Sequence, residues 1–157
     1  MRRRLKWIFI GIVLVAALLQ LTNPSRTNPP ILPGHAISPT NAPPPQIAAL
    51  LHTACYNCHS QETQWPWYSH IAPVSWLIAR DVNAGRARMN FSDWPNDHPD
   101  QAAKRLGDLS EEVHNGDMPP SNYQWMHPEA RLTPAQRDEL VKWADQEADR
   151  LRAAGGK

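Results

Sequence analysis

The stretch Cys55-Tyr56-Asn57-Cys58-His59 constrains this chain more than any other part of the sequence. Two cysteines separated by two residues and followed at once by histidine form the pattern to which a haem is attached covalently. Each thiol then forms a thioether with one vinyl group of the haem, and the imidazole can ligate the iron from one face. Cys55 and Cys58 are the only cysteines in the chain, so no second pair remains for a disulfide framework. The motif predicts one covalent haem c, bound through Cys55 and Cys58 with His59 on the iron.

Three other uses of the cysteine pair have to be compared with haem attachment. A thioredoxin-like dithiol follows a strand within a βαβ unit, whereas residues 46–54 have a helical pattern. A zinc site needs two further ligands at close spacing, and the sequence has no second Cys or His pair of that kind. A disulfide between Cys55 and Cys58 would leave His59 without a role. Haem attachment is the interpretation that uses all three residues.

The N-terminus has the composition of a segment that enters a membrane. Four of the first six residues are basic, and an apolar run follows from Trp7 to Leu21. At about fifteen residues this run is short for a full span of roughly twenty, but typical of a signal sequence. The residues near Leu21 fit a cleavage site poorly, which favours an uncleaved signal anchor over a cleaved signal peptide. Because basic residues stay in the cytoplasm, we expect residues 1–21 to anchor a single-pass protein of the bacterial cytoplasmic membrane with its C-terminal domain in the periplasm.

The charge of the exported part argues against nucleic acid as a partner. Of the 16 Lys and Arg residues, four precede Trp7, which leaves 12 against 15 Asp and Glu. A nucleic-acid-binding domain would show a basic stripe, and none is present here. We expect two partners: the membrane, through the N-terminal helix, and a redox protein that the sequence does not identify.

Proline density separates the anchor from the rest of the chain. Residues 22–45 contain eight prolines, which disfavour helix and sheet and favour an extended, semi-rigid tether. His35 lies in this tether and is expected to be solvated. Residues 46–153 are then left as a haem-binding domain, of a size that can bury a modest core.

Hydrophobic periodicity predicts four helices in this domain, and hence an all-α, cytochrome c-like fold. They span about 46–55, 73–85, 99–115 and 133–153, with Gly85 and Gly116 as stops for the second and third. Thr133 and Gln136 form a capping-box pattern at the start of the last helix. The expected buried positions, in the order of the helices, are Ile47, Leu50, Leu51 and Ala54; Trp76, Leu77, Ile78 and Val82; Ala102, Leu106, Leu109 and Val113; and Leu140, Ala144, Ala148 and Leu151.

Aromatic and basic residues near the motif could also contact the haem. Trp65-Pro66-Trp67-Tyr68 is too aromatic and too broken by proline to be regular structure. The indole N–H groups of Trp65 and Trp67 could donate to a haem propionate, or the rings could simply pack into a small core. Arg86 could pair with a propionate or lie on the surface.

A second axial ligand decides what the iron can do. A methionine opposite His59 raises the reduction potential and suits an electron carrier, a second imidazole lowers it, and an open position permits small-molecule chemistry. Met118 is the favoured ligand, because Pro119 and Pro120 stiffen its loop and so reduce the entropy lost on ligation. A methionine that only fills the core is the competing interpretation. The other candidates are Met89, Met126, His70, His114 and His127.

The chain resembles the small class I c-type cytochromes in its order of CxxCH, Met-Pro-Pro and closing helix. It resembles more closely the bacterial haem-binding domain family, whose members are membrane-anchored proteins with one c-type haem. The resemblance covers about residues 47–144, and the Trp-Pro-Trp-Tyr run is more distinctive of this family than of cytochromes generally. The matching residues are 55–60, 63–68, 72–76, Gly85, Arg86, 90–92, 118–120, Tyr123, His127, Pro128, Ala130 and Leu132.

The resemblance implies haem binding, with electron transfer inferred. We therefore expect a non-enzymatic haem protein that transfers single electrons at the outer face of the cytoplasmic membrane. The alternative is a peroxidase-like enzyme or a redox or gas sensor with an open iron site, assisted by His127, His70 or Arg86. The long aromatic insert after His59 is a departure from ordinary class I cytochromes, and it bears on whether Met118 meets the iron.

Overall fold

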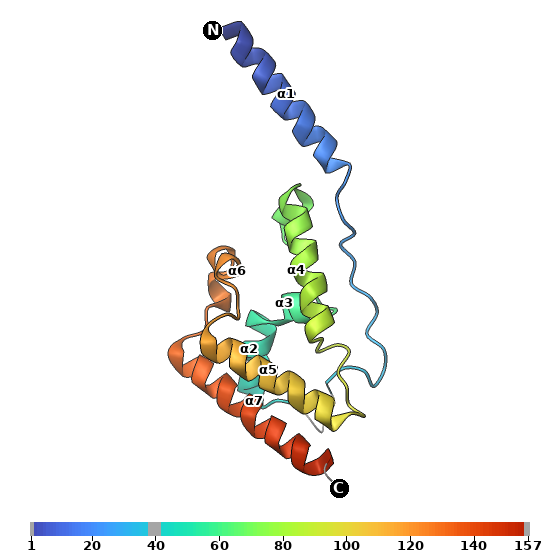
Figure 1. The fold of residues 1–157 in the computed structure, drawn as a ribbon, viewed down its shortest axis with the longest axis vertical. Coiled ribbons are helices and arrows are strands. Elements are labelled where there is room, and N and C mark those ends of the chain that lie inside the picture. The colour runs from blue at the N-terminus through green and yellow to red at the C-terminus, as the bar shows by residue number, and fades with distance from the viewer. Residues whose placement is uncertain (1, 38–41, 156–157) are drawn as a thin grey trace.

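A computed structural model describes residues 2–37 and 42–155, so that residues 38–41 of the Pro-rich segment lie outside the described residues. The described chain is helical and contains no strand, which agrees with the predicted all-α class (Figure 1). The elements in order are α1 (Arg2–Gln20), α2 (Pro45–Ala54), α3 (Tyr56–His59), the 3-10 turn η2 (Trp67–His70), α4 (Val74–Arg88), α5 (Pro99–Asn115), α6 (Ser121–Met126), the 3-10 turn η3 (Pro128–Ala130) and α7 (Pro134–Gly155).

The antiparallel pair α5 and α7 forms the base of the domain, and α2 packs against it (Figure 1). The predicted apolar faces of these three helices are confirmed: their stripe residues are buried, except for Leu50, which is half-buried. Phe91 and Trp94, from the connection between α4 and α5, complete the same core. Burial of each large apolar side chain contributes roughly 1.5–3 kcal/mol to folding, so this core carries most of the stability.

Local signals fix the ends of these helices as expected. Gly116 follows α5 with a φ of 83°, a left-handed conformation that glycine adopts without steric cost. At the start of α7 the Thr133 N–H donates to Gln136 Oε1 at 2.9 Å, and the Gln136 N–H donates to Thr133 Oγ1 at 3.2 Å. The predicted capping box is therefore confirmed.

Helix α4 differs from its prediction both in length and in the face that it buries. The predicted stop at Gly85 is wrong, because the helix continues to Arg88. Its buried residues are mostly small, namely Ser75, Ala79, Val82 and Gly85. Of the predicted apolar face only Val82 is buried, whereas Trp76 and Leu77 are exposed.

Gly85 explains this difference, because it is the point at which α4 and α3 touch. A Cβ atom built on Gly85 would lie 2.6 Å from the carbonyl oxygen of Cys58, closer than real Cβ atoms come to any neighbour. The glycine is needed for close backbone approach and not for ending a helix. Small residues along the same face let the two helices meet, while the large apolar residues of α4 point elsewhere.

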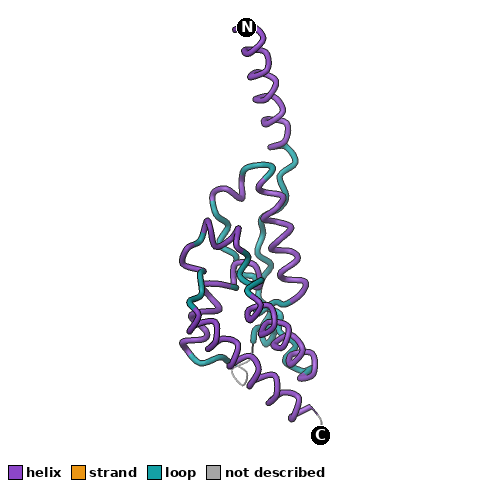
Figure 2. The backbone as a smooth tube through the Cα atoms, turned by 60° about the vertical axis from the view of Figure 1, so that its left-hand side comes forward, coloured by secondary structure: helices purple, strands orange, loops and turns teal. Residues whose placement is uncertain are grey.

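The Pro-rich segment is extended, as predicted, but it lies along the domain instead of standing apart from it (Figure 2). The N–H of Ile37 donates to the Phe91 carbonyl at 3.0 Å, and the N–H of Trp94 donates to the His35 carbonyl at 2.6 Å. The His35 side chain, expected to be solvated, is half-exposed and pairs with Asp93 at 3.0 Å. The described part of this segment is thus tied to the domain surface.

Helix α1 projects away from the domain at the end opposite α5 and α7 (Figures 1 and 2). None of its residues is buried, and its large apolar side chains are exposed around the whole helix. Within residues 2–37 and 42–155, the combination of length and apolar character required to cross a membrane is not met by any helix.

We predict that Gly85→Ala destabilises the domain. Overpacking at a site that cannot shift costs about 1–3 kcal/mol, more than the roughly 1 kcal/mol that alanine gains over glycine inside a helix. The measurement is the free energy of unfolding in denaturant. Gly107→Ala in α5 is the matched control, because its Cβ would meet only the end of the Arg152 side chain at 3.4 Å. Equal stability of the two variants would contradict the close-approach role of Gly85.

Candidate haem site

The CxxCH motif forms one tight turn of helix directly after α2. Cys55 ends α2 with its N–H donating to the Leu51 carbonyl at 2.8 Å, and its own carbonyl accepts from the His59 N–H at 2.9 Å. Both cysteines are free, half-buried thiols. Burial raises the pKa of Cys55 to about 12, with the nearby Cys58 adding to the shift.

The pKa of the Cys58 thiol is raised as well. Burial raises the pKa of this thiol to about 11; the Asp81 carboxylate adds to the shift and the Arg86 guanidinium opposes it. A redox dithiol of the thioredoxin kind has a lowered thiol pKa, because the thiolate is the attacking species. Two thiols that stay protonated at neutral pH do not fit that use. The described residues contain no group of three or more His, Cys, Asp or Glu that could hold a metal ion.

Both the imidazole and the backbone of His59 are held by the segment that follows α4. Its Nδ1–H donates to the Met89 carbonyl at 3.0 Å, while the Phe91 N–H donates to the His59 carbonyl at 2.8 Å. Burial lowers the pKa of this imidazole, which favours the neutral ring. With Nδ1 carrying the proton, the lone pair is on Nε2, the arrangement that metal-ligating histidines use.

Asn57 fastens the middle of the motif to two other parts of the chain. Its side-chain amide donates to the Tyr123 hydroxyl in α6 at 2.8 Å, and its Oδ1 accepts from the Gln64 N–H at 3.0 Å. The Thr63 hydroxyl donates to the Asn57 carbonyl at 2.9 Å. This asparagine therefore orients the turn that presents both cysteines.

A chain of three polar side chains lies beside the motif. The Tyr68 hydroxyl is 2.6 Å from His127 Nε2, and His127 Nδ1 is 2.9 Å from Glu129 Oε1. The Tyr123 ring stacks on His127 with centroids 4.3 Å apart. Burial raises the pKa of Tyr123 to about 12 and also raises that of Tyr68, with the neighbouring Cys58 adding to both shifts. The sequence did not predict α6, because six residues without an apolar stripe give no periodic signal, and it did not predict the Tyr68–His127–Glu129 contacts.

The two predicted tryptophans occupy different environments. Trp65 is half-buried, and its indole nitrogen is buried without a hydrogen-bond partner among the described residues. Trp67 is 71 % exposed, and its ring makes an edge-to-face contact with the Tyr68 ring, with centroids 5.8 Å apart. Burying an N–H group without an acceptor costs about 1–3 kcal/mol, so Trp65 has a donor ready for a further group.

Arg86 already has partners within the protein. Its Nε donates to the Ser60 carbonyl at 2.7 Å, and Nη2 donates to Thr63 Oγ1 and Asn28 Oδ1, both at 2.8 Å. Nη1 donates to the Thr27 carbonyl at 3.3 Å. The guanidinium thus joins the loop after the motif to the Pro-rich segment, and its contact with a propionate stays a prediction.

Met118 lies just after α5, where its N–H donates to the Glu112 carbonyl at 3.1 Å. Its side chain is half-buried and packs against the same core cluster as Cys55, Tyr56 and Met89. The structure thus brings Met118 to the core on which the motif rests, and its ligation of iron stays a prediction. The Met89 backbone, in contrast, supports His59.

A protein-family model described as "haem-binding domain" matches residues 14–146. The chain belongs to the haem-binding domain family. Searches of curated proteins and of solved structures each found no match. The matched range begins before the Pro-rich segment and so includes the part of it that lies against the domain.

The residues of this haem-binding domain fit the group that the family binds. Cys55 and Cys58 offer two thiols with no disulfide between them, and His59 has its Nε2 left for iron. The unpartnered indole N–H of Trp65 is a donor suited to a carboxylate such as a propionate. Met118 is a further donor on the same core.

We predict that Arg86→Lys releases the Pro-rich segment, because an ammonium cannot reproduce the planar set of donors. The measurement is the rate at which trypsin cuts the folded protein after Arg26, whose Nη1 donates to the Ser69 carbonyl at 3.4 Å. Loss of about 1.4 kcal/mol in the local opening energy accelerates this cleavage about tenfold. Arg80→Lys is the control, because Arg80 is exposed and pairs with its neighbour Asp81 at 2.9 Å. Cleavage at an unchanged rate in Arg86→Lys would mean that the guanidinium does not hold the segment.

Proposed function

We propose that this haem-binding protein carries one haem c, covalently attached through Cys55 and Cys58, and transfers single electrons at the outer face of the cytoplasmic membrane. The bound haem supplies an iron that alternates between the ferrous and ferric states. His59 and Met118 would be the protein ligands that hold this iron. Trp65 would donate to a propionate, and Arg86 in α4 and Trp67 in η2 are the further residues proposed to contact the haem.

The observation that carries this proposal is the state of the CxxCH turn. Both thiols are free, and the Met89 carbonyl holds the imidazole so that Nε2 can ligate iron. A hydrogen bond to Nδ1 orients the ring and increases its basicity as a ligand. The domain thus holds the imidazole and both thiols on one turn of backbone, as attachment of a single haem requires.

Electron transfer is supported by the way the site is fixed. Asn57 within the motif and Gly85 in α4 restrain the backbone of the motif, and a rigid site changes little between two oxidation states. Met118, stiffened by the prolines that follow it, would give the raised potential of His/Met ligation. An electron carrier needs no further catalytic group.

Membrane attachment is proposed through α1. Four of the first five residues of this helix are basic, and apolar side chains are exposed around the circumference of the rest. A helix that is apolar all round requires cover from lipid or protein. The basic end would remain on the cytoplasmic side and the haem-binding domain on the outside.

The Tyr68–His127–Glu129 chain favours a second candidate, a haem enzyme or a redox or gas sensor with an open iron site. His127 accepts from one hydroxyl and donates to a carboxylate, so it could move a proton beside the motif. His70 is exposed and Arg86 is occupied by the protein, which leaves His127 as the favoured residue for such a role.

We predict that replacing Cys55 and Cys58 by Ser abolishes covalent haem. The protein is produced in a host that assembles c-type cytochromes, and the measurements are its intact mass and haem staining after denaturation. The unsubstituted chain should carry the mass of one haem, each single variant should keep one thioether, and the double variant should keep none. Thr53→Ala, at an exposed position of α2, is the control and should carry one haem through both thioethers. A colourless unsubstituted protein with the mass of bare polypeptide would refute covalent attachment.

We predict that Met118→Ala lowers the reduction potential, on the order of 0.1 V within the roughly 0.8 V that axial ligands span. The variant should also bind carbon monoxide, because the sixth position becomes open. Redox titration and absorption spectra provide the measurements. Met126→Ala is the matched control, because that side chain is 41 % exposed at the end of α6. Unchanged potential and spectra in Met118→Ala would exclude this methionine, and high-spin ferric haem in the unsubstituted protein would favour the enzyme or sensor.

A further inference from the structure

The exposed apolar side chains of the domain gather at one end of it. Beyond residue 37, the large hydrophobic residues that the described structure exposes all lie in η2, in the η2–α4 junction and first turn of α4, or in α6. None lies on α5 or α7. We call this set the apolar end; it comprises Trp67, Ile71, Val74, Trp76, Leu77, Trp125 and Met126.

Contacts between elements bring these residues to one side of the molecule. Turn η2 packs against α4, and the Tyr68–His127 contact joins η2 to the residue that follows α6. Figure 1 places the N-terminal half of α4, together with α6, on the side of the α5–α7 pair from which α1 projects. Trp67 at 71 % exposure and Trp125 at 77 % are the most exposed members.

The chain leaving α1 is fastened to this same end. The indole N–H of Trp76 donates to the Thr22 carbonyl at 3.0 Å, and the Ser75 hydroxyl donates to Asn23 Oδ1 at 2.6 Å. The Asn23 amide donates to the His70 carbonyl at 3.3 Å. Two residues after its last turn, α1 is therefore already fixed to the η2–α4 junction.

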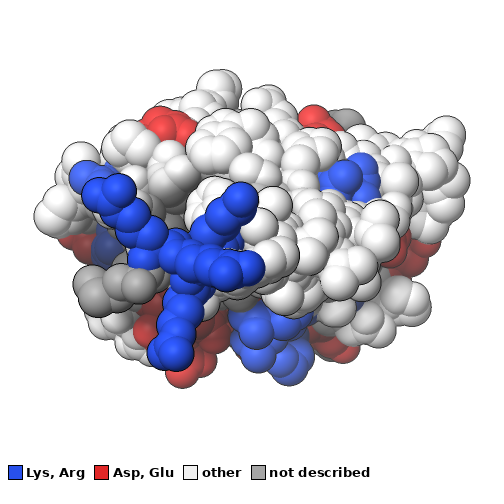
Figure 3. All heavy atoms as spheres, turned by 90° about the horizontal axis from the view of Figure 1, so that it is seen from above, with Lys and Arg blue, Asp and Glu red and all other residues white. Residues whose placement is uncertain are grey.

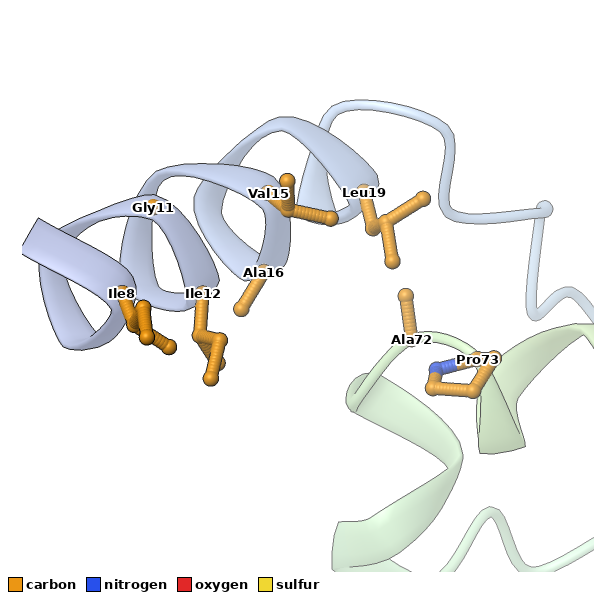
Figure 4. Close-up of a pocket in the computed structure, with 8 residues that line it drawn as sticks. All are labelled: Ile8, Gly11, Ile12, Val15, Ala16, Leu19, Ala72 and Pro73. Carbon is orange, nitrogen blue, oxygen red and sulfur yellow. The ribbon is translucent and has the colours of Figure 1, made fainter. Parts of the chain in front are cut away.

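An apolar groove lies between the surface of α1 and the η2–α4 junction of the apolar end. It has a volume of about 490 Å³ and is lined on one side by α1 and on the other by Ala72 and Pro73 (Figure 4). The α1 residues that line it are Ile8, Gly11, Ile12, Val15, Ala16 and Leu19. Apolar surface thus continues from α1 onto the domain.

None of the residues that form the apolar end carries a formal charge. No Lys, Arg, Asp or Glu occurs in residues 63–79 or 118–128, whereas α5 and α7 carry many. Viewed from the α1 end, basic side chains gather around the start of α1, and most of the surface surrounding them is neither acidic nor basic (Figure 3). The basic residues belong to the first turns of α1, and the ion pairs Lys104–Asp108, Arg150–Glu147 and Arg152–Asp149 lie on α5 and α7.

We infer that the apolar end rests in the boundary between headgroups and acyl chains of the bilayer that holds α1. This inference rests on the proposed membrane attachment of α1. Tryptophan is the side chain enriched at that boundary, because its ring is apolar and its N–H remains hydrogen-bonded. The bilayer is the favoured occupant because the apolar surface continues directly from α1 through the groove, and because no residue of the apolar end carries a formal charge. The charged helices α5 and α7 then face water.

The test uses the full-length protein with its haem, reconstituted into phosphatidylcholine vesicles. Single cysteines at Val74 and Trp125 carry a nitroxide label; the native cysteines are taken up by thioethers, and the unsubstituted protein gives the labelling background. Collision rates with oxygen, which partitions into lipid, and with a water-soluble nickel chelate locate each label. Gln101→Cys in the first turn of α5 is the solvent control, and Gly11→Cys in α1, where no atom lies within 4 Å of a Cβ, reports the anchor.

We expect the oxygen-to-nickel ratio at residues 74 and 125 to exceed that at residue 101 several-fold and to lie below that at residue 11. Ratios at 74 and 125 equal to that at 101, with residue 11 still lipid-exposed, overturn the inference and leave the anchor intact. Exclusion of both reagents at 74 and 125 means that haem, a partner protein or a second copy covers this end, and also overturns it. A water-exposed label at residue 11 refutes both the anchor and the inference.

Discussion

The contact on which this structure depends is the one between the backbones of α3 and α4. At Gly85 the α4 backbone lies so close to the Cys58 carbonyl that no Cβ fits between them. This contact places the end of α4 beside the motif, and the chain leaving α4 then supplies the Met89 carbonyl and the Phe91 N–H that hold His59. Gly85, which has no side chain, thus allows His59 and the backbone groups that hold it to come together from distant parts of the sequence.

The same contact explains why α4 was predicted less well than its neighbours. Helices α2, α5 and α7 bury large apolar stripes, so that the period of 3.6 residues in the sequence marks both the helix and its face. Helix α4 instead buries serine, alanine and glycine, because close packing of backbones needs small residues, and its large residues stay outside. A glycine that permits close approach has the same sequence signature as one that ends a helix. Only the position of Cys58 distinguishes the two uses.

The site divides in a similar way between what the sequence could and could not predict. Cys55, Cys58 and His59 could be identified because their spacing is itself the chemistry of attachment. The groups that orient His59 could not be identified, because they are backbone atoms some thirty residues away. Every residue has a backbone carbonyl, so the residue type at position 89 gives no sign of this contact. Residues that act through tertiary contacts, such as Asn57 with Tyr123, likewise carry no local pattern.

The described part of the Pro-rich segment is hydrogen-bonded to the domain, although its composition is that of a linker. Proline removes the regular hydrogen bonds of the backbone, but the remaining carbonyls of an extended chain still accept from a suitable donor. Arg86 is such a donor: its guanidinium donates at once to the Thr27 carbonyl and the Asn28 side-chain oxygen in the segment and to the Ser60 carbonyl beside the motif. The family match, which starts at residue 14, covers the segment as well. Because one guanidinium spans the segment and the loop after His59, displacement of the segment would remove its acceptors at Thr27 and Asn28 and leave those at Ser60 and Thr63. The position of the segment and that of the loop after His59 are therefore coupled through Arg86.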